Sequence, residues 1–248
     1  MMKKIIVSLL SISLVSFAQA SEESELKSIM EHATKVLVNT PVDSINKTPI
    51  DGLYELRAKA NIFYFAPKTE YFFFGEMFNK DGKSITRIKK ESALREYLVK
   101  NQDKAILIGD PKATNVIYEF TDPLCPYCLK YEDFIREKED VKRYVFLFYP
   151  AHASAEAKVT HILCSDDKAS AMEAVFNNEV KDVDLVSCED GIALRKEHTS
   201  IANQIGAKGT PTLFVNNTKI GGFSKQAINK LLVSNEKKET LVSKVNNQ

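Results

Sequence analysis

The stretch FTDPLCPYCLKY, residues Phe120–Tyr131, places two cysteines two residues apart, directly after an apolar run. That run, NVIYEF, predicts a buried strand, and the residues after Cys125 predict a helix. A Cys-x-x-Cys tetrapeptide serves zinc sites, iron–sulfur clusters and thiol exchange alike. The remainder of the chain has to decide between these chemistries.

The other two cysteines disfavour a metal. Cys164 and Cys188 lie far apart in the sequence, whereas a zinc site with four thiolates usually presents two close pairs. His161 lies near Cys164, which keeps a mixed site open, but the spacing is wrong for it. We therefore predict neither a metal nor a cofactor.

The local pattern around Cys125 favours thiol exchange. Cys125 falls at the N-cap of the predicted helix, and Pro126 takes the first helical position, where its missing N–H costs nothing. The helix dipole and the unpaired amides there favour a thiolate. Cys128 falls one turn further in, close enough to bridge but more covered. The pattern predicts one exposed, reactive thiol and one shielded thiol.

The first 20 residues, MMKKIIVSLLSISLVSFAQA, predict a cleaved secretory signal. Two lysines precede an apolar stretch that is too short to span a bilayer and ends in Ala18-Gln19-Ala20. Export matters for the cysteines, because disulfides form and persist outside the cytosol. The charge is nearly balanced, with 34 basic and 33 acidic residues and no basic stripe, so no nucleic-acid partner is indicated.

Residues 21–83 predict a small N-terminal domain without cysteine. A helix is expected over 22–38, and the alternation in GLYELRAKA predicts a half-buried strand. The apolar stripe of the expected helix, at i, i+3, i+4 spacing, consists of Leu26, Ile29, Met30, Ala33 and Leu37. NIFYF and YFFFGEMF predict two further strands that are apolar on both faces. One face contains Phe63, Phe65, Phe72 and Phe74, and the other contains Tyr64, Tyr71 and Phe73. Because one helix covers only one face, the second face is expected to be an interaction surface, although core filling explains part of the pattern.

A highly charged helix over residues 84–104 is expected to link this domain to the next. Residues 105–248 alternate strand and helix, with a helical insert over about 151–207, a hairpin formed by TPTLFV and KIGGF, and a final helix from Ser224. This order predicts an α/β domain following an α+β domain.

The motif FTDPLCPYC, followed downstream by GTPTLFVNNTKIGG, resembles the thioredoxin superfamily. The N-terminal module, the charged helix and an insert with a second cysteine pair narrow the resemblance to the periplasmic DsbC/DsbG family. The resemblance implies a small cystatin-like N-terminal dimerisation domain, a helical linker and a C-terminal thioredoxin-like domain with a helical insertion.

The resemblance also implies roles for individual residues. Cys125 would be the attacking thiol and Cys128 the resolving thiol. The loop Thr210-Pro211, with Pro211 in cis, would pair with an extended substrate. Cys164 and Cys188 would form a structural disulfide.

Two features depart from the family pattern. Pro126-Tyr127 between the cysteines is as in DsbG, whereas DsbC has Gly-Tyr, and this dipeptide helps to set the redox potential. Glu119 occupies a strand position that is apolar in DsbC and DsbG and acidic in the oxidase DsbA. A buried carboxylate there would relay protons or shift a thiol pKa, whereas at a sheet edge it would be solvated. The sequence leaves both alternatives open.

Together these features predict a homodimeric periplasmic thiol–disulfide isomerase or reductase. It would act on misfolded or wrongly oxidised exported proteins and would be kept reduced by a membrane reductase of the DsbD type. Two alternatives remain at this stage. One is a net thiol oxidase, favoured by Pro126 and Glu119, and the other is a holdase chaperone whose cleft carries the function.

Overall fold

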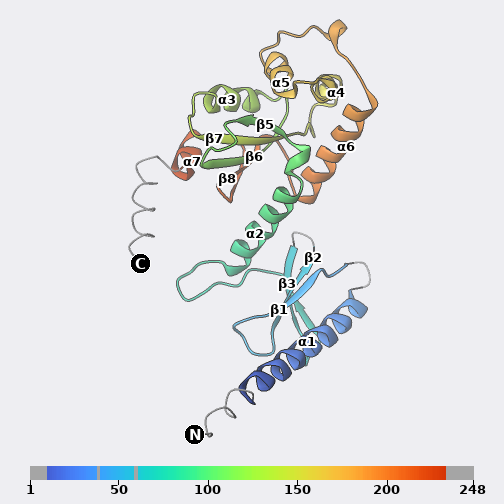
Figure 1. Ribbon diagram of the computed structural model, residues 1–248, viewed down its shortest axis with the longest axis vertical. Coiled ribbons are helices and arrows are strands. Elements are labelled where there is room, and N and C mark those ends of the chain that lie inside the picture. The colour runs from blue at the N-terminus through green and yellow to red at the C-terminus, as the bar shows by residue number, and fades with distance from the viewer. Residues whose placement is uncertain (1–9, 38–39, 59–60, 233–248) are drawn as a thin grey trace, which may run out of the picture. The chain divides into compact units, whose positions relative to one another are not determined.

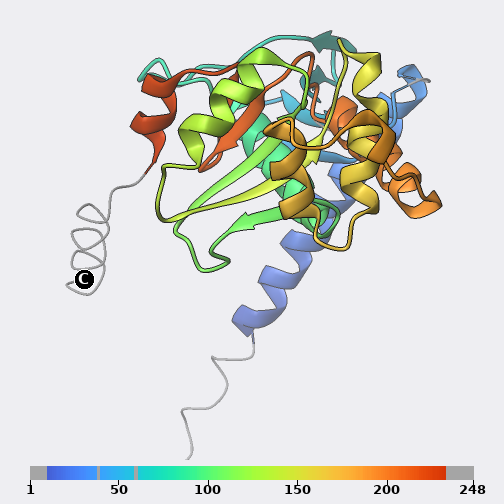
Figure 2. The same cartoon turned by 90° about the horizontal axis from the view of Figure 1, so that it is seen from above.

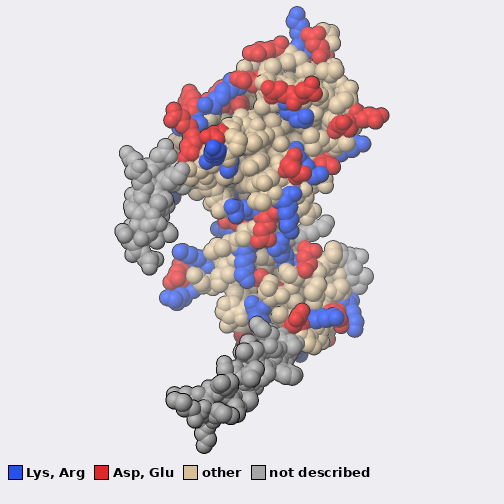
Figure 3. Space-filling model, in the orientation of Figure 1, with Lys and Arg blue, Asp and Glu red and all other residues tan. Residues whose placement is uncertain are grey.

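The computed structural model describes residues 10–37, 40–58 and 61–232 (Figure 1). The chain divides between Ala93 and Leu94 into two compact units. Residues 1–9 of the expected signal, which spans residues 1–20, lie outside the described residues. Helix α1 (Leu10–Val36) begins within the expected signal. None of the described helices combines the length and the apolar character needed to cross a membrane. Charged side chains of both signs are interspersed on the face that Figure 3 displays.

The first unit packs a helix on an antiparallel sheet. The strands lie in the order β1-β2-β3-β4, and they span Ser44–Lys47, Tyr54–Ala58, Asn61–Ala66 and Tyr71–Phe73. Ile29, Met30 and Ala33 of α1 pack with Phe63 and Phe65. The apolar spacing therefore identified the buried stripe of α1 correctly. Strand β1, with the sequence SINK, contains one apolar residue and gave no signal.

The sheet face opposite α1 is more covered than the sequence predicted. Tyr64 is buried there, and its hydroxyl pairs with that of Thr86 in α2 (Ile85–Lys100). Glu55, which alternation placed in solvent, is also buried, and its carboxylate pairs with Lys89 Nζ at 2.8 Å. The first turns of α2 therefore cover part of the face that was expected to be free.

Apolar surface remains beside edge strand β4 instead. Phe74, which alternation placed on the same face as Phe63, Phe65 and Phe72, does not fill that face as a buried residue, because 74% of it is exposed. Strand β4 ends at Phe73, so the alternation of faces stops before Phe74. Four exposed side chains, called the edge aromatics below, are Tyr71, Phe73, Phe74 and Phe78.

The second unit is a mixed sheet with the strand order β5-β7-β6-β8-β9. Strands β6 and β7 are parallel, and the other neighbours are antiparallel. The strands span Ile106–Gly109 (β5), Asn115–Thr121 (β6), Val141–Leu147 (β7), Thr212–Val215 (β8) and Thr218–Gly221 (β9). The central strand β6 leads directly into the turn that carries the CPYC motif.

Helices cover both faces of this sheet. Helices α3 (Pro126–Ile135) and α7 (Lys225–Leu231) lie side by side (Figure 2) and pack on Ile117 and Leu213. Helix α6 (Glu189–Gln204) places His198 against Phe146 on the other face. Burial lowers the pKa of His198 to about 4, so this imidazole is a neutral core group.

The segment between β7 and β8 forms a helical insert. It contains α4 (Glu156–Cys164), α5 (Lys168–Phe176) and α6, together with the short 3₁₀ helices η2 (Ala153–Ala155) and η3 (Asp182–Asp184). A further 3₁₀ helix, η1 (Gln102–Lys104), follows α2. A disulfide joins Cys164 at the end of α4 to Cys188 at the N-cap of α6. Gly191 lies against this bond, since a Cβ there would be 2.3 Å from Cys164 Sγ.

Candidate active site

The two cysteines of the CPYC motif occupy the first turn of α3. Cys125 is the N-cap residue with extended backbone angles, and Pro126 is the first helical residue. The Cys128 N–H donates to the Cys125 carbonyl over 2.9 Å. The local sequence produces this turn, because a proline at the first helical position needs no partner for its missing N–H.

Burial differs between the thiols less than the sequence predicted. Cys125 retains 7% exposure and Cys128 none, and neither takes part in a disulfide. The prediction of an exposed Cys125 is therefore wrong. Its thiol donates to the Thr210 carbonyl over 3.4 Å, so the loop before β8 helps to cover it.

The surroundings of Cys128 keep its thiol protonated. Burial raises the pKa of Cys128 well above its ordinary value, and the Thr121 hydroxyl and the Asp122 backbone N–H offset only part of this effect. A thiol exchanges only as the thiolate. Cys128 is therefore a poor nucleophile until its proton is removed.

Residues from a distant part of the chain complete the mouth of the site. The Thr210–Pro211 peptide is cis, and the Thr210 carbonyl lies beside Cys125 as described above. Tyr127, between the cysteines, is 61% exposed and directed to solvent. The site thus presents an almost fully covered Cys125 sulfur beside a backbone segment and an exposed tyrosine ring.

Glu119 lies on the central strand and is completely buried. Its carboxylate forms no hydrogen bond, and its nearest charge partner is Arg143 Nη1 at 3.8 Å. Arg143 instead forms a two-pronged pair with Glu132, at 2.7 and 3.1 Å. Burial raises the pKa of Glu119 to about 7, although Arg143 counteracts the effect. Of the two alternatives for Glu119, the solvated edge position is excluded.

Sequence reasoning missed a second buried carboxylate, Asp122. Asp122 is fully buried, and its Oδ2 lies 2.6 Å from His152 Nδ1. His152 has no cysteine nearby in the sequence that would indicate a metal site, and it lies 30 positions from Asp122, so nothing in the sequence joined the two residues. The signal that was available is an aspartate in the turn preceding the motif.

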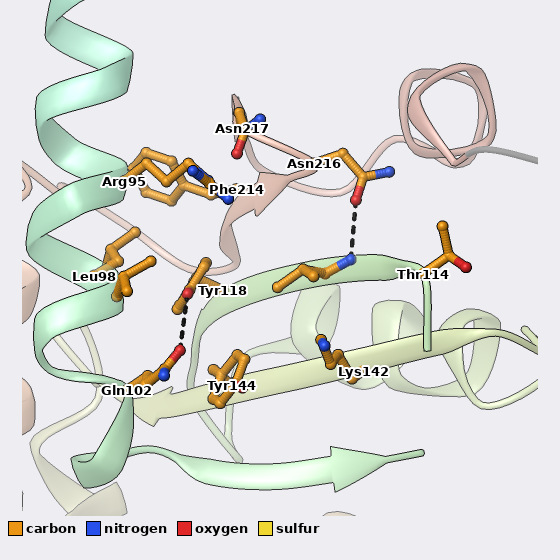
Figure 4. Close-up of a pocket in the computed structure, with 12 residues that line it drawn as sticks. Arg95, Leu98, Gln102, Thr114, Tyr118, Lys142, Tyr144, Phe214, Asn216 and Asn217 are labelled. Atoms are coloured by element: carbon orange, nitrogen blue, oxygen red, sulfur yellow. Dashed lines mark hydrogen bonds between the residues drawn. The ribbon is translucent and has the colours of Figure 1, made fainter. Parts of the chain in front are cut away.

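A cavity in the second unit lies between the end of α2 and the sheet. It has a volume of about 450 Å³, and neither cysteine lines it (Figure 4). Tyr118 and Tyr144 stack in its wall with ring centroids 5.1 Å apart, and Tyr118 Oη donates to Gln102. It is not part of the thiol site.

Comparisons with known proteins agree with this geometry. Residues 16–87 match the family model "Disulfide bond isomerase protein N-terminal domain", and residues 101–233 match "Thioredoxin-like domain". The chain is 24% identical over 212 residues to the thiol:disulfide interchange protein DsbC of Escherichia coli K12. The alignment covers 84% of this chain and 85% of that protein. It is 26% identical over 172 residues to DsbG of Pseudomonas aeruginosa, covering 63% of this chain and 66% of that protein.

Among solved structures, a disulfide interchange protein from Neisseria gonorrhoeae is 29% identical and aligns with a TM-score of 0.45. The alignment covers 52% of this chain and 96% of that chain. The two family models confirm the predicted fold class, an N-terminal DsbC-type domain followed by a thioredoxin-like domain.

Proposed function

The chain belongs to the DsbC/DsbG family of the thioredoxin superfamily and is a thiol–disulfide oxidoreductase or isomerase, and from this we propose that it rearranges or reduces incorrect disulfides in exported proteins through Cys125 and Cys128. One observation carries the proposal. Cys125 caps α3 with its sulfur 3.4 Å from the Thr210 carbonyl, while Cys128 lies buried one turn away.

The reaction begins with attack by the Cys125 thiolate on a substrate disulfide. A bond forms between Cys125 Sγ and one substrate sulfur, and the other substrate sulfur leaves as a thiolate that takes up a proton. Isomerisation follows when a different substrate thiolate attacks the mixed disulfide and Cys125 leaves. No net oxidation or reduction occurs on that route.

Reduction follows instead when Cys128 attacks Cys125 Sγ. The Cys125–Cys128 disulfide forms, the substrate sulfur leaves, and two electrons have passed to the substrate. Because burial raises the pKa of Cys128, the mixed disulfide persists until that proton is lost. Persistence gives other substrate thiols time to attack, which favours isomerisation over immediate reduction.

Further residues support the proposed site. The backbone of Thr210 and Pro211 would pair with an extended substrate, and Pro126, Tyr127 and Glu119 would tune the redox pair. The Cys164–Cys188 disulfide would hold the insert against the catalytic unit. We assign the protein to the periplasm, with residues 1–20 as its signal, and a membrane reductase of the DsbD type would return the Cys125–Cys128 pair to the dithiol.

The edge aromatics support a dimer and a substrate-binding surface. They present four large exposed apolar side chains in β4 and the segment that follows it in the DsbC-type domain. Such a patch on an exported protein marks an interaction site, and an unpaired edge strand is a template for pairing with another chain. The same surface favours holdase activity as a second function.

A single pair of variants separates these functions. Cys125→Ser/Cys128→Ser is expected to lose reactivation of scrambled ribonuclease and reduction of insulin, because no sulfur remains to exchange. The double variant should still suppress aggregation of an unfolded protein if the edge aromatics act as a holdase. Retention of scrambled-ribonuclease reactivation by the double variant would refute the proposed chemistry.

A further inference from the structure

Asp122 organises the turn that presents Cys125. Its side-chain Oδ1 accepts the Leu124 N–H over 2.9 Å, and its backbone carbonyl accepts the Cys125 N–H over 3.1 Å. The backbone N–H groups of two successive residues in the turn therefore both donate to Asp122. The carboxylate itself is fully buried.

The second carboxylate oxygen of Asp122 is held by a different segment. His152 Nδ1 lies 2.6 Å from Asp122 Oδ2, and 35% of the His152 side chain is exposed. An ionised carboxylate only accepts, so Nδ1 is the donor. A buried carboxylate that loses such a donor is strongly disfavoured. His152 thus supplies the partner of one carboxylate oxygen of Asp122, and the Leu124 N–H supplies the partner of the other.

The segment that carries His152 is tied to the same strand. Parallel pairing of β6 and β7 continues to Thr121 and Leu147, and the Phe148 N–H donates to the Thr121 carbonyl over 2.8 Å. His152 is then the N-cap residue of η2. A short, hydrogen-bonded path therefore fixes where the imidazole lies relative to the turn.

We propose that His152 is a positioning residue that acts through Asp122 to hold the Asp122–Cys125 turn, and thereby the two sulfurs, in the geometry for closing the Cys125–Cys128 disulfide. The inference deepens the proposed function, since it presupposes that Cys125 and Cys128 exchange. Burial raises the pKa of Cys128 and the Asp122 N–H counteracts this, so displacement of Asp122 also removes a group that favours the attacking thiolate.

The step to be measured is closure of a mixed disulfide. Reduced protein reacts with oxidised glutathione. A bond forms between Cys125 Sγ and one glutathione sulfur, the disulfide bond of oxidised glutathione breaks, and the other glutathione leaves as a thiolate and is protonated. Cys128, as the thiolate, then attacks Cys125 Sγ, the intramolecular disulfide forms, and glutathione leaves as a thiolate and is protonated. Acid quenching and mass spectrometry of the full-length protein give the rate of each step.

Three substitutions at His152 test whether closure depends on the hydrogen-bond donor at the Nδ1 position or on the size of the side chain. The amide nitrogen of His152→Asn stands where Nδ1 stands, so this variant should close within about twofold of wild type. His152→Ser suits an N-cap but is too short to reach Asp122, and it should close about tenfold more slowly, the effect of losing a charge-assisted hydrogen bond. His152→Gln keeps the bulk but carries its nitrogen beyond the Nδ1 position, and it should also be slow.

His161→Ser is the matched control. His161 also uses Nδ1, accepting the Val186 N–H over 3.1 Å inside the insert, and it should close at the wild-type rate. Thermal unfolding checks that each variant is folded. If His152→Ser is not folded, the closure rate of His152→Gln tests the positioning role instead. Faster hydrogen exchange at Leu124 and Cys125 should accompany slow closure.

The outcomes separate the inference from its premise. If wild-type Cys125 forms no mixed disulfide with glutathione, the proposed function fails. If the mixed disulfide forms but His152→Ser and His152→Gln close it at the wild-type rate, only the role of His152 is overturned. Equal slowing by His152→Asn would also overturn it, because rescue requires only the donor at Nδ1.

Discussion

Glu119 provides the sharpest test of the electrostatics beneath the active site. Burial raises its pKa from 4.5 to about 7. In the unfolded chain the carboxyl is solvated and returns to its ordinary value, so between these two pKa values the folded state binds more protons than the unfolded state. Stability must therefore fall as the pH rises through this window. We expect Glu119→Gln to abolish that fall.

The magnitude follows from the pKa difference. Each pKa unit corresponds to about 1.4 kcal/mol, so the folded protein loses about 3 kcal/mol at this site between pH 4.5 and pH 8. Glu119→Gln keeps the shape and never ionises. Relative to wild type, the variant should be close in stability at pH 4.5 and more stable by about 3 kcal/mol at pH 8.

Urea unfolding followed by circular dichroism at both pH values measures this difference. Because the chain has two compact units, the transition that shifts should be that of the second unit, which contains Glu119. Glu173→Gln is the control, since 61% of the Glu173 side chain is exposed. A stability difference between Glu119→Gln and wild type that is the same at both pH values would refute the reasoning.

Two further predictions concern the insert and the edge aromatics. Gly191→Ala places a Cβ 2.3 Å from Cys164 Sγ and 3.1 Å from the Cys164 nitrogen. The overlap should destabilise the second unit by about 1–3 kcal/mol, measured by thermal unfolding. Gly209→Ala is the control, because no atom lies within 4 Å of a Cβ there. Equal stability of the two variants would contradict the prediction. Phe73→Ser/Phe74→Ser should lower the mass found by analytical ultracentrifugation and reduce the reactivation of scrambled ribonuclease, while the reduction of insulin is kept. An unchanged mass and an unchanged reactivation rate would argue against an interaction surface at β4.

The sequence predicted the motif turn well because its determinants are local. Pro126 after a strand and a short loop specifies the start of a helix, and the residue before it becomes the N-cap. The placement of Cys125 at the N-cap, with Cys128 one turn inside, therefore followed from four consecutive residues. The apolar stripe of α1 was predictable for the same reason, since its spacing is a property of one helix.

Burial at individual positions was predicted less well. Alternation in a strand says which residues share a face, but it does not say which face a helix will cover. Tyr64 and Glu55 are buried because the start of α2 returns over their face. Phe74 is exposed because the edge strand ends one residue earlier. Each outcome depends on a contact between segments that the spacing within either segment does not encode.

By itself the sequence determined the order of the two units, the junction of β6 with α3 and the N-cap position of Cys125, because periodicity, capping and residue type act over a few neighbours. Only the tertiary structure decided the environment of that pair. It placed Thr210 beside Cys125, buried Glu119 at the centre of a sheet, and brought His152 to Asp122 across 30 positions. These contacts join segments through the sheet order and the packing of helices on it. A thiol's pKa and a carboxylate's partner depend on what surrounds them in space, which becomes defined only when the chain has folded.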